Sequence, residues 1–464
     1  MSHGSLNPPT VPCALPGSPL AAARAGLDSC VHCGFCLPAC PTYLALEDEN
    51  DSPRGRLLLM GALLDGSVAP DDPIVGQHLD RCLGCRGCET ACPSGVPYGQ
   101  LLEATRATVA AYRPLPLIGR LLLWGFAREW VLRPALVVAR LVRDVSVAHG
   151  LARMLPARFA MPFAMLASTA RPTRRRTRAR AGATSAQTAS APTGSSTCAS
   201  SAPSGSPRGT ASLLTGCVME GLFTEVNRAT ERTLTRNGWA MHETAGQRCC
   251  GALHAHAGDL EGARTLARAN IAAFETSGAE TIVLNSAGCG AMCKEYGHLL
   301  HEDPSWADRA ARFAARVRDV SELLAAAGPA VAGEAEAAAA TAREALIPVA
   351  YDAPCHLQHA QRVVDPPLAV LRAATQIRLV PLADSDQCCG SAGIFNLIQP
   401  DVATRVLSPK LARISESGAQ VVATGNPGCL MQIGGGLVLA GSEVTARHPV
   451  ELLDEGYERE GIRR

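Results

Sequence analysis

The sequence predicts an α+β multidomain protein: a mainly helical domain near the N-terminus, then two repeated small parallel α/β domains packed as a pseudo-symmetric pair. Three observations predict this organisation. A cysteine-proline run occurs twice between residues 30 and 93, a set of four cysteines occurs twice after residue 212, and a Ser/Thr/Ala/Pro-rich stretch separates the two regions. With 464 residues, the chain is long enough for about two to four domains with separate cores.

Both copies of the first pattern read C-x2-C-x2-C-x3-C-P, with cysteines at Cys30, Cys33, Cys36, Cys40 and at Cys82, Cys85, Cys88, Cys92. This is the run that holds 4Fe-4S clusters in two-cluster ferredoxins, where the fourth cysteine ligates the other cluster. Three cysteines on one tight loop can bind three corners of a cube, while the fourth, next to a proline, points away.

We therefore predict crossed ligation: cluster 1 on Cys30, Cys33, Cys36 and Cys92, and cluster 2 on Cys40, Cys82, Cys85 and Cys88. The alternative is a pair of zinc sites. Zinc usually uses two separated cysteine pairs, which leaves the third cysteine and the proline unexplained in both copies.

Composition narrows the kinds of partner and compartment that we expect for this protein. Lys and Arg total 43 against 42 Asp and Glu, so overall charge gives no reason to expect a nucleic-acid partner. The 19 cysteines are unusual, and residues 1–26 do not resemble a secretory signal. We therefore expect metal-ligating cysteines in a reducing, cytoplasmic compartment rather than disulfides.

A helix is expected to begin near Ser52 and to run through Leu64, with Arg54 and Arg56 in its first turn. These arginines could offset the negative charge of thiolate-ligated clusters. Because isolated surface charges contribute little, we expect them instead to be solvated.

Residues 112–166 are aliphatic with interspersed arginines. A membrane-spanning helix needs about 20 mostly apolar residues, and Arg120, Arg128, Glu129, Arg133 and Arg140 interrupt every run. The segment could lie on an anionic membrane or against a partner subunit. Because buried amphipathic helices are commoner, we expect it to cover the first domain.

The composition of residues 167–211 cannot build a core. The predicted domain limits are a disordered N-terminus at 1–26, the ferredoxin-type domain at 27–111, a helical connector at 112–166, a disordered linker at 167–211, the first repeat at 212–324, a linker at 325–345 and the second repeat at 346–464.

The repeats share their cysteines: Cys217, Cys249, Cys250 and Cys289 in the first, and Cys355, Cys388, Cys389 and Cys429 in the second. Apolar strand-like runs, such as residues 281–284 and 421–424, precede cysteine-bearing turns and helical segments, which predicts parallel α/β units. Sites in such sheets lie at the carboxyl ends of strands. We interpret the four thiols of each repeat as a metal or cluster site; structural zinc and reversible disulfide chemistry remain alternatives.

Three cysteines fall outside these patterns. Cys13 and Cys198 lie in segments expected to be disordered, and Cys293 has no counterpart in the second repeat, where Ile433 stands. The histidines near the repeat cysteines, His254, His256 and His356, are expected to hydrogen-bond near the sites rather than to ligate.

The chain resembles the iron-sulfur subunit of glycolate oxidase (glycolate dehydrogenase), a family that combines a two-cluster ferredoxin domain with two CCG cysteine-rich domains. The motifs that carry the resemblance are CVHCGFCLPACPTY, SPRGRL, CLGCRGCETACPSGVPYG, CCGALHAHAG and PCHLQHAQ, which begin at residues 30, 52, 82, 249 and 354. The resemblance implies an oxidoreductase complex in which flavoprotein partners oxidise glycolate to glyoxylate. This chain would carry electrons through its clusters to a quinone or other acceptor.

We expect no flavin and no catalytic residue on this chain, because no G-x-G-x-x-G follows a strand. A peripheral contact with the cytoplasmic face of the inner membrane is a further expectation. Related CCG domains often end in C-x2-C, and heterodisulfide reductase subunits use the extra cysteine for an unusual cluster. Here that fifth thiolate is absent or displaced, which argues against a catalytic disulfide reductase. The equivalent subunit of a lactate or glycerol-3-phosphate dehydrogenase remains an alternative.

Overall fold

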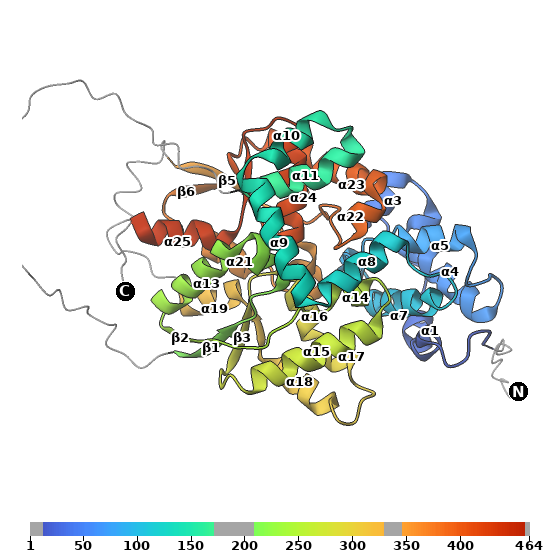
Figure 1. Cartoon of the computed structure of the whole chain (residues 1–464). Coiled ribbons are helices and arrows are strands. Elements are labelled where there is room, and N and C mark those ends of the chain that lie inside the picture. The colour runs from blue at the N-terminus through green and yellow to red at the C-terminus, as the bar shows by residue number, and fades with distance from the viewer. Residues whose placement is uncertain (1–12, 171–207, 329–345, 460–464) are drawn as a thin grey trace, which may run out of the picture.

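The computed structural model of the chain describes residues 13–170, 208–328 and 346–459 (Figure 1). Most of the segments expected to be disordered, namely 1–12, 171–207 and 329–345, lie outside the described residues. The described ends of those segments are ordered, however. Residues 13–26 include two helices, the last connector helix ends at Ser168, and the first strand begins at Gly209.

The N-terminal domain is helical, as expected. Its elements are α1 (Pro19–Ala22), α2 (Arg24–Asp28), α3 (Pro41–Leu46), η1 (Glu49–Asp51), α4 (Pro53–Asp65), α5 (Pro73–Asp80), α6 (Gly87–Thr90) and α7 (Tyr98–Ala110). The expectation of disorder through residue 26 was wrong for α1, because Leu20 is fully buried in the apolar core of this domain. Cys13 also packs against that core.

The connector forms α8 (Leu117–Phe126), α9 (Glu129–Asp144), α10 (Val147–Met154) and α11 (Ala157–Ser168). We expected these helices to cover the ferredoxin-type domain. Instead, α11 packs along a helix of the second repeat, and α9 contacts the first repeat (Figure 1). The difference arises because small residues of the second repeat, Gly434 and Gly435, let α11 approach closely at Ser168 and Met165. Among the described residues, no helix is both long and apolar enough to cross a membrane.

The first repeat contains a sheet and its covering helices. Its strands are β1 (Gly209–Leu213), β2 (Trp239–His242), β3 (Thr281–Leu284) and β4 (Val317–Asp319), and its helices are α12 (Cys217–Leu222), α13 (Thr224–Arg236), α14 (Ala252–His256), α15 (Leu260–Glu275), α16 (Ala287–Lys294), α17 (Tyr296–Leu299), α18 (Ala307–Arg316) and α19 (Val320–Ala327).

The second repeat is built in the same way. Its strands are β5 (Ile347–Tyr351), β6 (Ile377–Val380), β7 (Val421–Ala423) and β8 (Thr445–Arg447), and its helical elements are η3 (His356–Ala360), α21 (Asp365–Arg372), α22 (Phe395–Ile398), α23 (Pro400–Glu416), α24 (Pro427–Leu439) and α25 (Pro449–Arg459).

Both sheets are parallel, with strand orders β2-β1-β3-β4 and β6-β5-β7-β8. In the first sheet, Ile282 and Leu284 face a core with α15 and α18, whereas Val283 faces the opposite core with α13 and α19. Burial on both faces explains why β3 is continuously apolar rather than alternating. The parallel α/β prediction is therefore confirmed, and the carboxyl ends of β1, β3, β5 and β7 each lead to a helix with a cysteine at its N-terminal end.

Candidate iron-sulfur and cysteine-rich sites

The two N-terminal cysteine runs adopt the same unusual backbone. In the first run His32 and Gly34 have φ values of 54° and 85°, and in the second Gly84 and Arg86 have φ values of 62° and 63°. These left-handed residues flank the middle cysteine at matching positions. Residues other than glycine rarely adopt this conformation, so its recurrence indicates a loop that must curl around a bound group.

The loops gather the eight cysteines into two sites. One small cavity, called site 1, is lined by Cys30, Cys33, Cys36, Cys88 and Cys92. The other, called site 2, is lined by Cys40, Cys82, Cys85 and Cys88. Each site therefore includes three cysteines of one run and the last cysteine of the other, with Cys88 lining both. The local cause differs between the runs: Cys40 caps α3 directly before Pro41, whereas Cys92 precedes a turn and α7 begins only at Tyr98.

The donor chemistry fits iron-sulfur clusters. Four soft sulfur donors meet at each site, and a cluster requires them as thiolates. Burial raises the pKa of the Cys88 thiol well above its usual value and also raises that of Cys36. Forming a thiolate at these positions is therefore unfavourable unless a positive charge is bound beside it. The iron ions of a cluster would supply that charge.

Sites 1 and 2 differ in their exposure. Cys33 is exposed at site 1, and the adjacent side chains of Val31 and Phe35 are 69% and 66% exposed. At site 2, Cys40 and Cys82 are buried. Site 1 therefore opens to the protein surface, whereas site 2 lies inside the molecule.

The interpretation of Arg56 as a solvated residue was wrong. Its side chain is fully buried, and its guanidinium donates hydrogen bonds to the His78 carbonyl, to Thr42 Oγ1 and to Asp51 Oδ1. Arg54 does follow the expectation: it is partly exposed and forms a 2.8 Å ion pair with Glu49. Sequence position could not separate the two, because both lie in the first turn of α4.

In each repeat, the glycine after the cysteine pair has a backbone that favours glycine. Gly251 and Gly390 have φ values of 87° and 83°. A Cβ on Gly390 would lie 2.7 Å from the Ala403 carbonyl oxygen, and one on Gly251 would lie 3.3 Å from that of Ala263. The glycine of each CCG pattern thus allows a tight turn in which the backbone next to the cysteine pair packs closely against the following long helix, α15 or α23.

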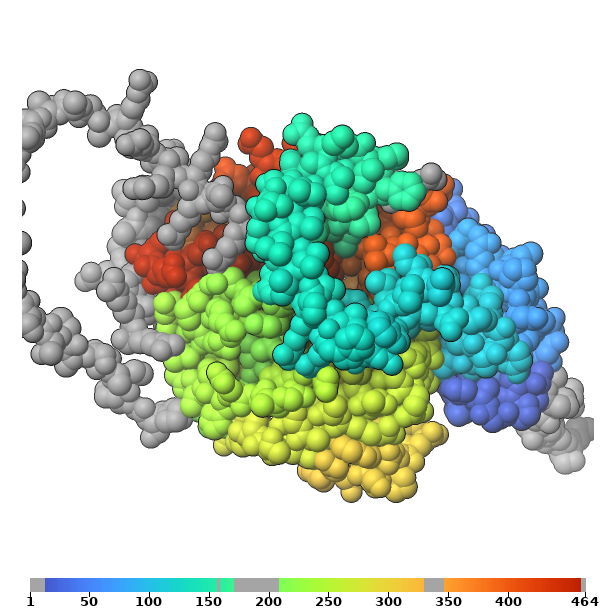
Figure 2. Space-filling model, viewed as in Figure 1, coloured from blue at the N-terminus to red at the C-terminus, as the bar shows by residue number. Residues whose placement is uncertain are grey.

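The repeat cysteines line one shared cavity of about 340 Å³ beneath α8 and α11. Figure 2 shows a hollow between these connector helices and the second repeat. All eight predicted cysteines border the cavity: Cys217, Cys249, Cys250, Cys289, Cys355, Cys388, Cys389 and Cys429. Within each set, thiols lie close together; Cys217 and Cys249 are 3.6 Å apart, and Cys389 and Cys429 are 3.2 Å apart.

Thiol-thiol hydrogen bonds polarise both sets. Bonds from Cys217 and Cys250 lower the pKa of Cys249 well below its usual value. Bonds from Cys355, Cys389 and Cys85 do the same for Cys388. A bond from Cys250 also lowers the pKa of Cys289. The first repeat therefore has two thiols that favour the thiolate and the second has Cys388, each beside protonated donors. That arrangement suits a metal or cluster better than four inert buried thiols would.

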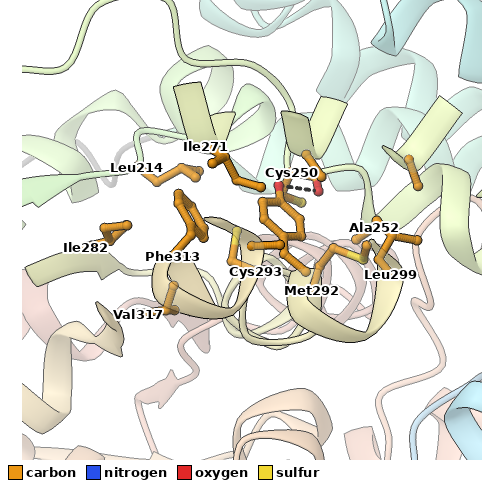
Figure 3. Close-up of a cluster of buried hydrophobic side chains, with 14 of the residues drawn as sticks. Leu214, Cys250, Ala252, Ile271, Ile282, Met292, Cys293, Leu299, Phe313 and Val317 are labelled. Carbon is orange, nitrogen blue, oxygen red and sulfur yellow. Dashed lines mark hydrogen bonds between the residues drawn. The ribbon is translucent and has the colours of Figure 1, made fainter. Parts of the chain in front are cut away.

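Cys293 does not take part in this cavity. Its side chain is fully buried in the apolar core of the first repeat, beside Met292 and Phe313 (Figure 3). Burial raises the pKa of the Cys293 thiol well above its usual value, so it stays protonated. Each repeat therefore offers four thiols to the cavity, and the extra cysteine is part of the packing.

The three histidines take different positions. His356 lies at the cavity with Nδ1 3.5 Å from Cys355 Sγ, and burial lowers its pKa to about 3, so it is neutral. His256 pairs with Glu103 of α7 at 3.0 Å. His254 is buried behind the cysteine pair. His256 thus joins the first repeat to the ferredoxin-type domain, a role that sequence reasoning did not assign.

A contact between the two kinds of site was also missed. Cys85, at site 2, packs against a cluster that contains Cys388 of the second repeat, and the proximity of the two thiols raises the pKa of Cys85 and lowers that of Cys388. Leu83 belongs to the same cluster, and Thr90 lies 2.8 Å from His359. No sequence signal marks this contact, since its partners Thr90 and His359 lie 269 residues apart.

Comparison with known proteins agrees with these sites. Residues 26–96 match the model of a 4Fe-4S dicluster domain, and residues 211–294 and 349–434 each match that of a cysteine-rich domain. The sites and the fold therefore define the class: an iron-sulfur protein with a two-cluster domain and two CCG domains.

The full-length relatives are more specific. The chain is 33% identical over 442 residues to the probable glycolate oxidase iron-sulfur subunit of Bacillus subtilis, covering 92% of this chain and 94% of the relative. It is also 33% identical over 440 residues to the glycolate oxidase iron-sulfur subunit of Escherichia coli, covering 94% and 95%. Lactate utilization protein A of Geobacillus kaustophilus is 30% identical over 243 residues, which is 52% of this chain. The chain belongs to the family of glycolate oxidase iron-sulfur subunits.

Proposed function

We propose that this chain is the electron-transfer subunit of a flavin-dependent glycolate dehydrogenase complex. Flavoprotein partners would oxidise glycolate to glyoxylate, and this subunit would carry the electrons to a quinone or another acceptor. Bound 4Fe-4S clusters at sites 1 and 2 would supply one-electron storage. The chain's own residues hold the two sites, bury site 2 and set its distance from the second repeat.

The observation that carries this proposal is that each cavity includes three cysteines of one run and the last cysteine of the other, with Cys88 lining both cavities. We accordingly propose crossed ligation, with cluster 1 on Cys30, Cys33, Cys36 and Cys92. Site 1, which opens to the surface beside Val31 and Phe35, is the expected entry for electrons from the flavoprotein. An exposed cluster edge shortens the distance to a docked donor.

Replacing single fourth cysteines tests this assignment in the full-length chain. The Cys92→Ser variant should lose the cluster at site 1, and the Cys40→Ser variant the one at site 2, so each should retain about four of eight iron atoms. Iron and labile-sulfide analysis with electron paramagnetic resonance separates the two cases. Loss of the site 2 signal in Cys92→Ser would refute crossed ligation, and an iron-free wild-type chain would refute the function.

We further propose that the repeats form a pseudo-symmetric pair. Helix α13 packs against α25, and α19 packs against α21. Since α13 corresponds to α21 and α19 to α25, these contacts are reciprocal, as expected of a two-fold arrangement.

The shared cavity then places one set of four thiols on each side. We propose that these sets hold additional metal or clusters; wild-type iron above eight atoms would support this.

We propose that the protein acts in the cytoplasm, docked to the anionic inner face of the membrane through the connector. Exposed large apolar side chains concentrate there: Leu117, Ile118, Leu121, Trp124, Trp130, Val137, Val138, Leu141, Val145, Val147, Met154 and Phe159. Arg120, Arg128, Arg133 and Arg153 are exposed among them, and the acidic Glu129 is paired with Arg133. Basic helices with tryptophans and aliphatic residues suit an anionic interface.

Vesicle co-sedimentation tests this contact. The wild-type chain should bind vesicles containing phosphatidylglycerol more strongly than neutral vesicles, and Trp130→Glu should weaken that binding. Ile74→Glu, at a side chain of α5 that is also exposed, is the matched control. Equal weakening by both variants, or no binding to either vesicle, would contradict the membrane contact and favour a protein partner at this surface.

A lactate-oxidising complex is the second candidate, because lactate utilization proteins match half of this chain. Purification of the intact complex followed by reduction of the clusters with glycolate or with lactate distinguishes the two. Faster reduction by lactate would replace glycolate as the assigned donor.

A further inference from the structure

A buried positive charge lies beside site 2 that sequence reasoning did not predict. The Arg56 side chain is completely excluded from solvent, with Nε 2.7 Å from the His78 carbonyl oxygen and Nη1 3.0 Å from Thr42 Oγ1. Burial by itself would lower its pKa, but the nearby Cys82 and Cys40 sulfurs, among other groups, raise it overall. The guanidinium is therefore a permanent cation next to two of the four predicted ligands of cluster 2.

The carboxylate that pairs with Arg56 is shared with a second arginine. Asp51, fully buried, accepts from Arg56 through Oδ1 at 3.1 Å and from Arg81 through Oδ2 at 3.0 Å. His78 Nδ1 lies 3.2 Å from the same carboxylate and adds no negative charge. Two guanidinium groups thus share the Asp51 carboxylate. A second carboxylate, that of Asp48, lies within 4.8 Å of it. Asp48 is only half-buried, so water screens its charge more than that of the fully buried Arg56.

Site 1 has a weaker counterpart. Arg54 reaches the first cysteine loop, with Nη1 3.3 Å from the His32 carbonyl oxygen, but its side chain is 32% exposed and is neutralised by Glu49 at 2.8 Å. Water and the paired carboxylate screen its charge. The same first turn of α4 therefore supplies an effective cation to site 2 and a screened one to site 1.

We propose that Arg56 raises the reduction potential of the cluster held at site 2 above that of the cluster at site 1. This inference rests on the proposed function, because it requires both clusters. Adding an electron makes a thiolate-ligated cluster more negative, and a buried cation at low dielectric stabilises that state most. Electrons then collect at the site whose Cys85 contacts Cys388 of the second repeat.

A second buried cation lies beside the thiols of the second repeat. Lys410 is 2% exposed, and its charge lies close to Cys389 and Cys388. The first repeat has the neutral Asn270 at the equivalent position of α15, seven residues before the matching Ser-Gly-Ala segment. The thiols of the second repeat thus have a buried cation beside them, paired with Asp352 at 2.6 Å, where those of the first repeat have a neutral amide.

Redox titration of the full-length chain, followed by electron paramagnetic resonance, tests the proposal. Cys40→Ser and Cys92→Ser assign each signal to a site. In Arg56→Gln, the ratio of reduced to oxidised cluster at site 2, measured at the wild-type midpoint, should fall at least tenfold, which is 59 mV for one electron. Arg56→Lys should keep most of the ratio, and the matched control Arg54→Gln should change either site less than twofold.

Asp51→Asn provides an independent variant of opposite sign. Removing the shared carboxylate should raise the reduced fraction at site 2, and this variant decides the matter if Arg56→Gln loses iron. An unchanged site 2 potential in an iron-replete Arg56→Gln or Asp51→Asn variant overturns the inference. A wild-type chain without two clusters would instead overturn the proposed function, so the two failures are distinguishable.

Discussion

The two cysteine-rich repeats share one framework but bury different charges within it. Lys410 of the second repeat forms a 2.6 Å ion pair with Asp352, and both side chains are 2% exposed. At the matching position of the first repeat, the neutral Asn270 donates to the Cys249 carbonyl and accepts from the Arg248 backbone. Only the arrangement in the second repeat, with Lys410 and Asp352, involves charges, and that repeat also contacts site 2. The comparison shows that duplication conserved the thiol positions while the electrostatic environment diverged.

The side chains that cap the helices after β4 and β8 also differ in their charge. Asp319 caps α19 by accepting from the Ser321 backbone, and His448 accepts from the Val450 backbone through Nδ1. His448 also donates from Nε2 to the Asn285 carbonyl of the first repeat, 3.0 Å away. Its two nitrogens therefore require the neutral ring, whereas Asp319 has no such requirement.

The largest expected effect concerns the buried ion pair. Lys410→Met should destabilise the protein by about 3–5 kcal/mol, because it leaves the Asp352 carboxylate buried without its cation. Asn270→Leu, the matched change in the first repeat, should cost about 1–3 kcal/mol, since it removes only neutral hydrogen bonds. Anaerobic chemical unfolding measures both; equal losses would show that the charge difference between the repeats has no energetic consequence.

A smaller difference is expected at the CCG glycines. Gly390→Ala should cost about 3 kcal/mol, because it adds a backbone clash at 2.7 Å to the strain of positive φ. For Gly251→Ala, where the nearest atom is at 3.3 Å, about 1–2 kcal/mol is expected. Gly418→Ala, with positive φ but open space around it, is the control for strain alone. A Gly251 variant less stable than the Gly390 variant would contradict the packing argument.

The smallest effect is a pH dependence of opposite sign at the two caps. Burial raises the pKa of Asp319 to about 6, so its contribution to stability is present at low pH and is lost as pH rises through 6. Burial lowers the pKa of His448 to about 4, so its contribution is present above its unfolded pKa of about 6.5 and declines as pH falls below that value.

Between pH 7 and pH 5, acidification should therefore gain about 1 kcal/mol through Asp319 and lose about 2 kcal/mol through His448. Asp319→Asn should make the protein more acid-sensitive than the wild type, and His448→Asn less so; asparagine can maintain either cap. Anaerobic thermal unfolding at both pH values provides the measurement. Parallel pH curves for the two variants would show that the caps do not titrate as inferred.

Much of the fold could be predicted because the relevant signals are local in sequence. The apolar run 281–284 became β3, and each CCG cysteine pair lies in a turn at the sheet edge. The same local reasoning failed for α1, because a Pro-, Gly- and Ala-rich segment gives no sign that Leu20 will find a core. It also misplaced the connector, since amphipathicity identifies an apolar face without identifying what covers it.

The sequence by itself determined the grouping of cysteines into two N-terminal runs and two repeat sets, because ligand spacing is a property of short loops. Tertiary structure alone decided that Arg56 is buried while Arg54 is exposed, that Cys293 belongs to a core, and that Cys85 meets Cys388. Each of these outcomes depends on elements far apart in the chain docking against one another. Burial and charge environment are products of that docking, whereas cysteine spacing is already present before it.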